Sequence, residues 1–372
     1  MENQNFWILV GTRPEVIKQV PLYFELVRRH GKDRVSLIGT GQHRELLDQA
    51  LSHFGVRLDH NLEIMKPGQS LTDSSAQVLL GMNDLFQYHK PDWLIVQGDT
   101  TSAAMAAWAA FQSGVPVAHN EAGLRSYDLE NPFPEEANRR LISIVAKIHF
   151  APTELAKKAL LKEGIDEKSV FVTGNTGIDA LKWTLDQPRP RSIDFVMNSI
   201  RNQGLRPVLL TAHRRENSGS MDGWFKALGE FLSVNPGYGL IYPLHPNHLA
   251  RPAAEKHLRH LPQVHLVPAL NYGETCHLLS ACDLVVTDSG GIQEEAATLG
   301  IPTVICRKTT ERMEAVEYGI ARLAGTETDT ILSVMNWAMN FAGKGSPHHP
   351  DSFPNSIFGN GQASVKIADL LQ

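Results

Sequence analysis

Residues 6–14 are Phe-Trp-Ile-Leu-Val-Gly-Thr-Arg-Pro, five apolar residues followed by a polar turn. A short apolar run that ends at a glycine is typical of a buried strand. The stretch from Val16 to Arg29 that follows has the pattern of a helix. A strand, a turn and a helix in this order form the unit of a parallel sheet, and such sheets bind ligands beyond the carboxyl ends of their strands.

The same unit recurs along the chain, so the sequence predicts an α/β fold. Each predicted strand ends in polar or glycine residues, for example Gly98-Asp-Thr100 and His119-Asn-Glu-Ala-Gly123. The pattern restarts after Gly174, which predicts two Rossmann-like, doubly wound domains. We expect residues 1–174 in the first domain, together with residues 356–372 as a returning C-terminal helix, and residues 175–355 in the second. The predicted strands are Phe6–Val10, Val35–Ile38, Trp93–Val96, Val115–Ala118, Pro207–Thr211, Leu240–Pro243, Leu284–Thr287 and Thr303–Cys306.

The composition agrees with two globular domains. The chain has 372 residues, 42% of them hydrophobic and 20% charged, which is enough apolar material for two cores. The net charge of -5 leaves no basic surface for a nucleic-acid backbone. No apolar run reaches the length of a membrane span. The three cysteines form no Cys-x-x-Cys pair, which favours a reducing cytoplasm and argues against a disulfide framework or a zinc site.

The sequence Asp288-Ser289-Gly290-Gly291 is a candidate anion site, because it joins a predicted strand to a helix. Glycines permit close backbone approach, and the amides at a helix start attract phosphate. The alternative is an ordinary turn in which Ser289 caps the helix. No Walker loop and no dinucleotide fingerprint is present, so we expect no NAD or other cofactor.

Several basic residues are candidates to complement an anion. Arg13 lies in a turn at the end of a predicted strand, and Arg214 and Arg215 follow His213 directly after another. A solvated surface pair is the alternative for the two adjacent arginines. Lys18 and Arg312 complete this basic set.

Four carboxylates are candidates for acid–base chemistry: Asp99, Glu121, Glu135 and Glu136. Asp99 and Glu121 follow neighbouring predicted strands, and Glu135 follows the proline-rich Asn131-Pro-Phe-Pro134. Converging carboxylates acquire different pKa values and can therefore act as acid and base. The alternatives are a helix cap for Asp99 and a first-turn acid favoured by the helix dipole for Glu135.

Histidine is abundant, with 16 in the chain, and most of them must have no chemical role. His213 and His245 stand out because each follows a predicted strand. The histidines near His245 are not joined by acids or cysteines in a ligand pattern, so we expect no metal. No Gly-x-Ser-x-Gly elbow marks a serine hydrolase.

Taken together, these residues resemble the non-hydrolysing UDP-N-acetylglucosamine 2-epimerases over nearly the whole chain. The resemblance rests on nine blocks in order: Gly11-Thr-Arg-Pro-Glu-Val-Ile-Lys18, Thr40-Gly-Gln-His-Arg-Glu45, Gly98-Asp-Thr100, Glu121-Ala-Gly-Leu-Arg125, Pro134-Glu-Glu-Ala-Asn-Arg139, Thr173-Gly-Asn175, His213-Arg-Arg-Glu216, Thr287-Asp-Ser-Gly-Gly-Ile-Gln-Glu-Glu295 and Thr309-Thr-Glu-Arg312.

The resemblance implies two domains that face each other across a cleft, as in glycosyltransferase-B folds, and a cytoplasmic homodimer acting on a UDP-sugar. It implies interconversion of UDP-GlcNAc and UDP-ManNAc through a 2-acetamidoglucal. Gln42 and His43 match a segment where some bacterial members bind a second UDP-GlcNAc as an activator. The implied catalytic residues are Asp99, Glu121, Glu135 and His213; the implied substrate-binding residues are Arg13, Lys18, Arg139, Arg214, His245, Ser289, Gly290, Gly291, Glu294 and Arg312.

This chain departs from the family pattern around the nucleotide and sugar. Thr275 stands where an aromatic residue is common, and Tyr272 or His277 is an alternative partner for the base. Tyr127 replaces a glycine and Met313 a proline. Three alternatives therefore stay open: an epimerase for a related nucleotide sugar, a glycosyltransferase of the same architecture, and a catalytically silent sensor.

Overall fold

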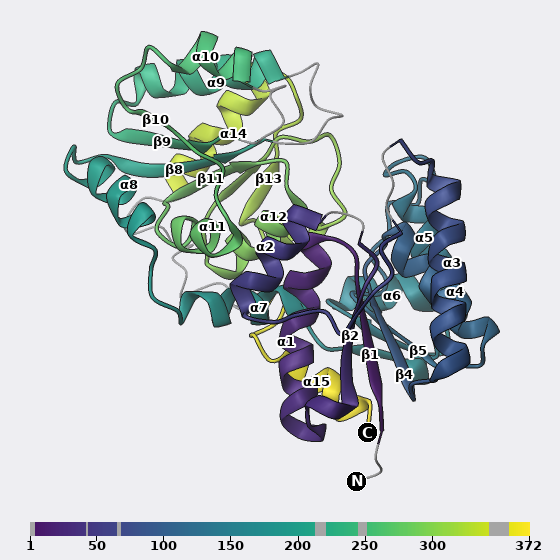
Figure 1. The fold of residues 1–372 in the computed structure, drawn as a ribbon. Coiled ribbons are helices and arrows are strands. Elements are labelled where there is room, and N and C mark those ends of the chain that lie inside the picture. Colours follow the sequence, from purple (N-terminus) through teal and green to yellow (C-terminus); the bar gives the residue numbers. More distant parts are fainter. Residues whose placement is uncertain (1–3, 42–43, 65–67, 213–220, 245–250, 342–356) are drawn as a thin grey trace. The chain divides into compact units, whose positions relative to one another are not determined.

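The structure, a computed structural model, describes residues 4–41, 44–64, 68–212, 221–244, 251–341 and 357–372. The chain divides into two compact units, Met1–Lys182 with Phe358–Gln372, and Trp183–Ile357. Each unit contains a parallel sheet with helices packed against it (Figure 1). The predicted α/β class with two parallel sheets is thereby confirmed.

The sheet of the first unit has seven strands in the order β3-β2-β1-β4-β5-β6-β7. All strands are parallel, but successive strands are added on one side of β1 up to β3 and on the other side from β4 onwards. Doubly wound sheets bind ligands at such a switch point of the strand order, here between β1 and β4. The turns after β1 and β4 are Gly11-Thr-Arg13 and Gly98-Asp-Thr100. The strands are β1 (Phe6–Val10), β2 (Val35–Gly39), β3 (His60–Asn61), β4 (Trp93–Gln97), β5 (Val117–Asn120), β6 (Ile148–Ala151) and β7 (Val170–Val172).

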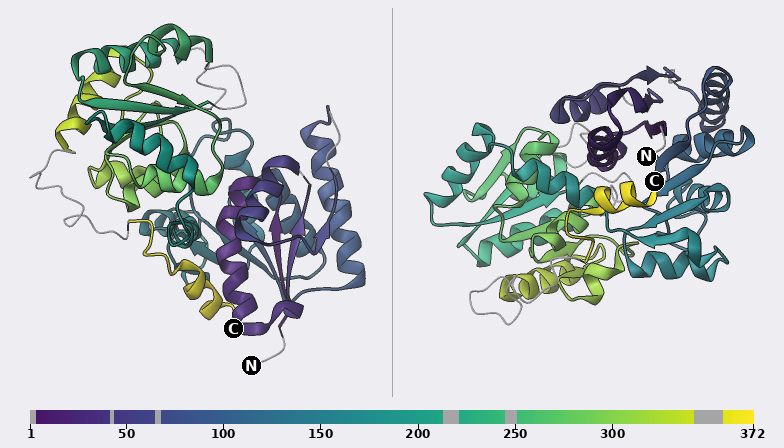
Figure 2. Two further views of the ribbon diagram at one scale, coloured as in Figure 1. Left: turned by 60° about the vertical axis from the view of Figure 1, so that its left-hand side comes forward. Right: turned by 90° about the horizontal axis from the view of Figure 1, so that it is seen from below.

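Helices cover this sheet on both faces. Trp7 and Leu9 of β1 point into a core that α3, α4 and α5 close. Figure 2 shows α1 beside the C-terminal helix α15, and the two helices are in contact. The helices of the unit are α1 (Arg13–His30), α2 (Arg44–Phe54), α3 (Leu71–Tyr88), α4 (Thr101–Gln112), α5 (Glu135–Val145), α6 (Glu154–Lys162), α7 (Thr176–Leu185, in which the division between the units falls) and α15 (Ala363–Leu370), with 3-10 turns η1 (Lys32–Arg34) and η2 (Glu167–Ser169).

The C-terminal helix is attached to the first unit by a buried carboxylate. Asp179 accepts hydrogen bonds from the amides of Ala363, at 3.2 Å, and Ser364, at 2.8 Å. These amides belong to the first turn of α15 and have no partner within the helix. A negative charge is also favourable at this end of the helix dipole. Asp179 therefore explains why the last residues of the chain pack with the first unit.

The second unit has a six-stranded sheet in the order β10-β9-β8-β11-β12-β13. Val208 and Leu210 of β8 pack against one set of helices and Leu209 against the other, so both faces of this central strand are buried. The strands are β8 (Arg206–Thr211), β9 (Tyr238–Pro243), β10 (Val264–Val267), β11 (Leu284–Thr287), β12 (Thr303–Ile305) and β13 (Ala321–Leu323); the helices are α8 (Arg191–Arg201), α9 (Met221–Val234), α10 (Arg251–Leu258), α11 (Tyr272–Leu279), α12 (Gly290–Thr298), α13 (Met313–Glu317) and α14 (Thr328–Phe341).

The switch point of the second sheet lies between β8 and β11, which are neighbours. The hydroxyls of Thr211 and Thr287, at the ends of these strands, are 2.5 Å apart. Helix α12 starts just after β11, so the predicted anion site is at the switch point. In the helices that the structure describes, none is both long and apolar enough to cross a membrane.

Candidate active site

Glu15 joins the two turns at the switch point of the first unit. One of its carboxylate oxygens accepts hydrogen bonds from the amides of Gly11, at 2.9 Å, and Thr12, at 2.7 Å. The other accepts a hydrogen bond from the Thr100 hydroxyl, at 2.7 Å. Burial raises the pKa of Glu15, and these hydrogen bonds act in the opposite direction. The turn that carries Arg13 and the turn that carries Asp99 are therefore held to each other.

The backbone around Asp99 is fixed from three sides. Gly98 has a positive φ of 68°, which glycine adopts without strain. The carbonyl of Gly98 accepts a hydrogen bond of 2.8 Å from the Nε2–H of His119, and the carbonyl of Asp99 accepts one of 2.9 Å from the Asn138 amide. His119 is fully buried, and burial lowers its pKa to about 3, so the ring is neutral. Thr100 caps α4 in place of Asp99, which leaves the Asp99 carboxylate available.

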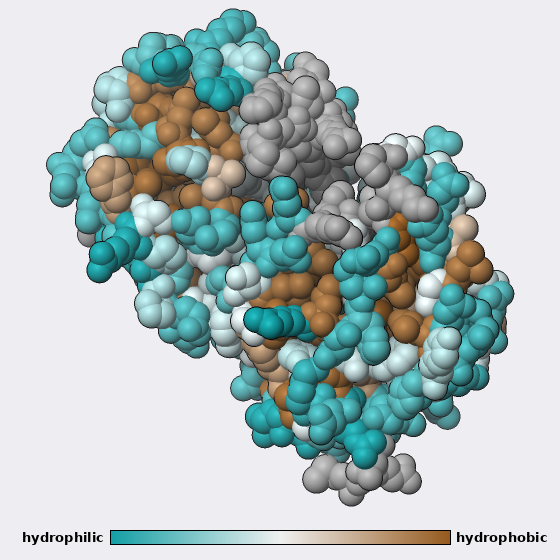
Figure 3. All heavy atoms as spheres, viewed as in Figure 1, coloured by the Kyte–Doolittle hydropathy of each residue, from teal (hydrophilic) through white to brown (hydrophobic). Residues whose placement is uncertain are grey.

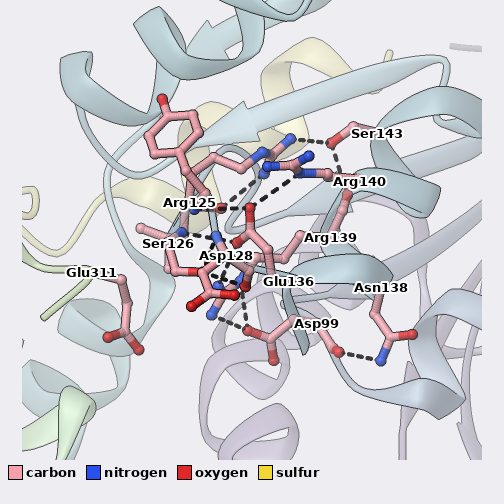
Figure 4. A network of polar contacts seen from close by, with 12 residues as sticks. Asp99, Arg125, Ser126, Asp128, Glu136, Asn138, Arg139, Arg140, Ser143 and Glu311 are labelled. Atoms are coloured by element: carbon pink, nitrogen blue, oxygen red, sulfur yellow. Dashed lines mark hydrogen bonds and ion pairs between the residues drawn. The ribbon is translucent and has the colours of Figure 1, made fainter. Parts of the chain in front are cut away.

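The carboxylate of Asp99 is bound by Arg139 of α5. Nε and Nη2 of Arg139 lie 2.9 and 2.7 Å from the same Asp99 oxygen. The third guanidinium nitrogen, Nη1, donates to Glu136 at 3.1 Å (Figure 4). The Arg139 side chain is 4% exposed and that of Asp99 is 26% exposed. Arg139, which the resemblance assigns to the substrate, thus bridges two carboxylates, and Asp99 keeps a solvent-accessible surface.

Glu121 follows β5 and is held in an uncommon backbone conformation. Its φ is +63°, a region that residues other than glycine rarely adopt. Lys18 and Gln97 donate to its two carboxylate oxygens, and the Asn175 amide lies 3.4 Å from one of them. These contacts come from three other elements of the unit, so the surrounding structure fixes the buried carboxylate.

The three predicted carboxylates of the first unit lie in neighbouring segments. A Cβ atom on Gly98 would be 3.4 Å from an oxygen of Glu121, so the Glu121 carboxylate lies against the turn that carries Asp99. Glu135 is the first residue of α5, the helix whose Asn138 and Arg139 bind Asp99. The structure therefore places Glu121 and Lys18 against the turn that carries Asp99 and places Glu135 on the helix that binds Asp99, while Arg13 starts α1 on the adjoining turn.

In the second unit, Arg312 lies against the start of α12. Nε of Arg312 donates to Glu294 at 3.0 Å, and Arg312 also pairs with Glu311. A Cβ atom on Gly290 would be 2.7 Å from Cζ of Arg312, closer than side-chain atoms approach. Ser289 is at the cap position without capping through its side chain, and its amide donates to Thr287 at 2.9 Å. Ser289, Gly290, Gly291, Glu294 and Arg312 are thus one cluster with the free amides of a helix start.

The two aromatic alternatives to Thr275 are both unsuitable for stacking on a base. Tyr272 is 5% exposed and donates to Glu295 at 3.2 Å, and burial raises its pKa well above 10. His277 is also 5% exposed. The Thr275 hydroxyl donates to the backbone carbonyl of Asn271 at 2.8 Å. Both residues are buried in the structure, which argues against this alternative from the sequence.

Some predicted residues lie outside the described part of the chain. They are Gln42, His43, His213, Arg214 and His245, and their assignments stay predictions. The sequence did not reveal His119 and Asn138 as contacts of the Asp99 segment, nor that Glu136 binds Arg139. His119 lies two residues before Glu121, and Glu136 directly follows Glu135. The sequence does not show which polar groups of other segments these two side chains contact. In the described residues, no group of three or more histidine, cysteine or acidic side chains is arranged to hold a metal.

Two doubly wound units, with carboxylates at one switch point and a helix-start anion cluster at the other, define a class of nucleotide-sugar enzyme. A family model described as UDP-N-acetylglucosamine 2-epimerase matches residues 26–372. The UDP-N-acetylglucosamine 2-epimerase of Neisseria meningitidis serogroup A is 40% identical over 370 residues, which cover 97% of each chain. That of Bacillus subtilis is 39% identical and covers 100% of this chain and 96% of its own.

A solved structure agrees with these sequence relatives. The crystal structure of UDP-GlcNAc 2-epimerase from Neisseria meningitidis bound to UDP-GlcNAc superposes with a TM-score of 0.89, at 38% identity, and 99% of each chain is covered. The chain belongs to the UDP-N-acetylglucosamine 2-epimerase family, as its sequence motifs indicated.

The two glycines at the start of α12 predict opposite effects of alanine. Gly290→Ala places a methyl group against the Arg312 guanidinium, so it should lower the free energy of unfolding by about 1–3 kcal/mol. Gly291→Ala meets nothing within 4 Å and should be neutral or stabilising by up to about 1 kcal/mol. Urea unfolding of both variants measures this difference. Equal stabilities of the two variants would show that Arg312 does not pack on Gly290.

Proposed function

We propose that this chain interconverts UDP-N-acetylglucosamine and UDP-N-acetylmannosamine by inverting C2 of the sugar. The support is its family, together with a solved relative that is described as bound to UDP-GlcNAc. The opening Gly11-Thr-Arg-Pro-Glu15 resembles the branch of the family that does not hydrolyse its substrate. We therefore propose that the sugar product leaves as a UDP-sugar and that UDP is not lost by hydrolysis.

The proposed route is elimination, because no carbonyl group adjoins C2 to acidify its proton and the sequence carries no dinucleotide fingerprint for a redox route. A base removes the C2 proton while the C1–O bond to UDP breaks, which gives a 2-acetamidoglucal and UDP. UDP then adds back to C1, and an acid delivers a proton to the opposite face of C2. The leaving diphosphate needs electrostatic stabilisation, and the C2 proton needs carboxylates with distinct pKa values.

We assign the C2 proton transfers to Asp99 and Glu135, and the charge near the anomeric oxygen to Glu121 with His213. The ion pair with Arg139 holds the Asp99 carboxylate in place while part of its side chain stays exposed, as a group that acts on the substrate requires. Glu121 is buried beside Lys18, whose charge can balance a developing negative charge. The proposed diphosphate and ribose contacts are Arg13, Lys18, Arg214, His245, Ser289, Gly290, Gly291, Glu294 and Arg312.

One observation supports this function above the others: Asp99, Glu121 and Glu135 occupy neighbouring segments of one unit. A glycosyltransferase using the same nucleotide site needs fewer acids there, and a silent sensor needs none. Carboxylates on neighbouring segments agree with a reaction that needs an acid and a base at two faces of one ring carbon.

The proposed reaction predicts incorporation of solvent deuterium at C2. The wild-type protein is incubated with UDP-GlcNAc in deuterated water and followed by proton NMR. We expect loss of the C2 proton signal and the appearance of UDP-ManNAc without an acceptor. Asp99→Asn and Glu135→Gln should each slow this exchange by about 10²-fold or more, whereas the exposed Glu130→Gln should not.

Other outcomes of the same experiment identify the alternatives. Exchange only with another nucleotide sugar would mean a related epimerase, consistent with Thr275, Tyr127 and Met313 near the nucleotide and sugar segments. Transfer that begins when an acceptor is added would mean a glycosyltransferase. Binding without exchange would mean a sensor. Full exchange by Asp99→Asn and Glu135→Gln would remove these residues from the mechanism.

We further propose that the chain is a homodimer located in the cytoplasm. Exposed apolar side chains on three adjacent helices support an interface: Leu80 of α3 is 64% exposed, Phe111 of α4 55% and Ile144 of α5 75%. Figure 3 shows hydrophobic residues over the region of α3 and α4. The three cysteines are buried and form no disulfide in the described part of the chain, which agrees with a reducing compartment, and cell fractionation tests that location.

The dimer predicts a mass of twice 41.2 kDa in light scattering. Phe111→Lys and Ile144→Lys together should shift the protein to the monomer. The substitutions would bury two unpaired positive charges from each subunit in the proposed interface, which is unfavourable. Lysine at exposed Phe195 of the second unit, which is 78% exposed, is the control and should leave the mass unchanged. A monomeric wild type would refute the dimer.

A further inference from the structure

Glu136 is a charged residue with no exposed surface. It follows the proposed catalytic Glu135 directly, at the second position of α5. One of its oxygens accepts hydrogen bonds from the Ser126 amide, at 2.9 Å, and from Nη1 of Arg139, at 3.1 Å. The other accepts from the Tyr127 amide and from Nε of Arg140, each at 3.2 Å. Two of these donors are backbone amides and two are arginine side chains of the same helix (Figure 4).

These donors keep the buried carboxylate ionised. Burial alone would raise the pKa of Glu136, but the hydrogen bonds from Ser126 and Arg139 and the charge of Arg139 outweigh it, and the pKa is lowered. An ionised carboxylate without exposed surface is costly unless it is fully hydrogen-bonded. A neutral amide at this position would lose the charge that binds two arginines.

The guanidinium of Arg139 transmits this constraint to Asp99. The group is planar and rigid, so a contact at one nitrogen limits the direction of the other two. Nη1 is bound to Glu136, while Nε and Nη2 are bound to one oxygen of Asp99. Without Glu136, Arg139 would lose the contact at Nη1 that limits the direction of its guanidinium group.

Glu136 also fixes the segment that follows Glu121. Its two amide partners belong to Ser126 and Tyr127, and Tyr127 has a φ of +62°. A backbone in this region is strained for residues other than glycine and requires support from its surroundings. A single carboxylate thus holds both the arginine beside Asp99 and the turn after the Glu121 segment.

We infer that Glu136 is a positioning residue for the reaction, which acts by holding Arg139 so that Arg139 orients the carboxylate of Asp99. The inference rests on the proposed epimerase function. Adjacent glutamates at the start of α5 then have different tasks: Glu135 acts on the substrate and Glu136 fixes the geometry of Asp99. Arg139 accordingly belongs to this support, whereas the sequence resemblance assigns it to substrate binding.

The test compares Glu136→Gln with a matched control, Glu163→Gln. Glu163 also binds a buried arginine, since it accepts hydrogen bonds of 2.9 and 2.7 Å from Arg125, but Arg125 does not contact Asp99. Both variants should unfold at a lower temperature than the wild type. Only Glu136→Gln should lower kcat, by about 10²-fold, as expected for a misplaced catalytic group. Its KM for UDP-GlcNAc should stay within about twofold of the wild type, because uniform substrate binding is unchanged.

A second variant, Arg139→Lys, tests the inference in case the Glu136→Gln protein does not fold. Arg139→Lys keeps a positive charge between the carboxylates but loses the planar fork, so it should lower kcat while KM is retained. A raised KM with unchanged kcat would instead show that Arg139 binds substrate, and would overturn the inference.

The remaining outcomes separate this inference from the proposed function. A Glu136→Gln variant with the kcat of the wild type would also overturn the inference. So would equal losses of kcat in Glu136→Gln and Glu163→Gln. In both cases an active wild type would leave the proposed function intact. A folded wild type with no exchange at C2 would refute the function itself.

Discussion

The structure of the first unit depends on satisfying buried carboxylates at the carboxyl ends of parallel strands. A buried carboxylate is unfavourable unless its oxygens are hydrogen-bonded or paired with a cation. Glu15, Glu121 and Glu136 meet this requirement with amides, hydroxyls and cations from neighbouring segments. For each of the three carboxylates, partners come from at least two segments of the unit, so the contacts that stabilise the charges also fix these segments relative to one another. The half-exposed Asp99 and Glu135 are placed on this support.

The second unit achieves a similar result with fewer charges. There the turn after β11 is fixed by Thr287 and Thr211, and Arg312 is held against the backbone of Gly290 by Glu294. This arrangement presents helix-start amides next to a guanidinium, which suits a diphosphate. The glycine is required here because a side chain would occupy the position of the arginine. In the proposed function, the first unit provides the acids and bases and the second provides the anion site.

Much of this fold could be predicted from the sequence because its central strands are continuous apolar runs. Phe6–Val10 and Leu284–Thr287 have the predicted limits. The predicted strand Val115–Ala118 is displaced to Val117–Asn120, since the Val115 amide closes the end of α4 and Pro116 has no amide hydrogen. Helix α1 begins at Arg13, earlier than predicted, because Thr12 and Glu15 form a capping box. The two-residue strand β3 has no apolar run that could reveal it.

The site was only partly predictable, for a physical reason. The residue types and strand ends indicated Asp99, Glu121 and Glu135, but the pairs Lys18–Glu121 and Arg139–Asp99 join positions distant in sequence.

The most direct test of the account is a crystal structure with UDP-GlcNAc bound. It should show C2 of the sugar within about 3–4 Å of an oxygen of Asp99 or Glu135, with Arg139 still on Asp99. A sugar out of reach of both carboxylates, or an Arg139 that has left Asp99 for the diphosphate, would contradict the account.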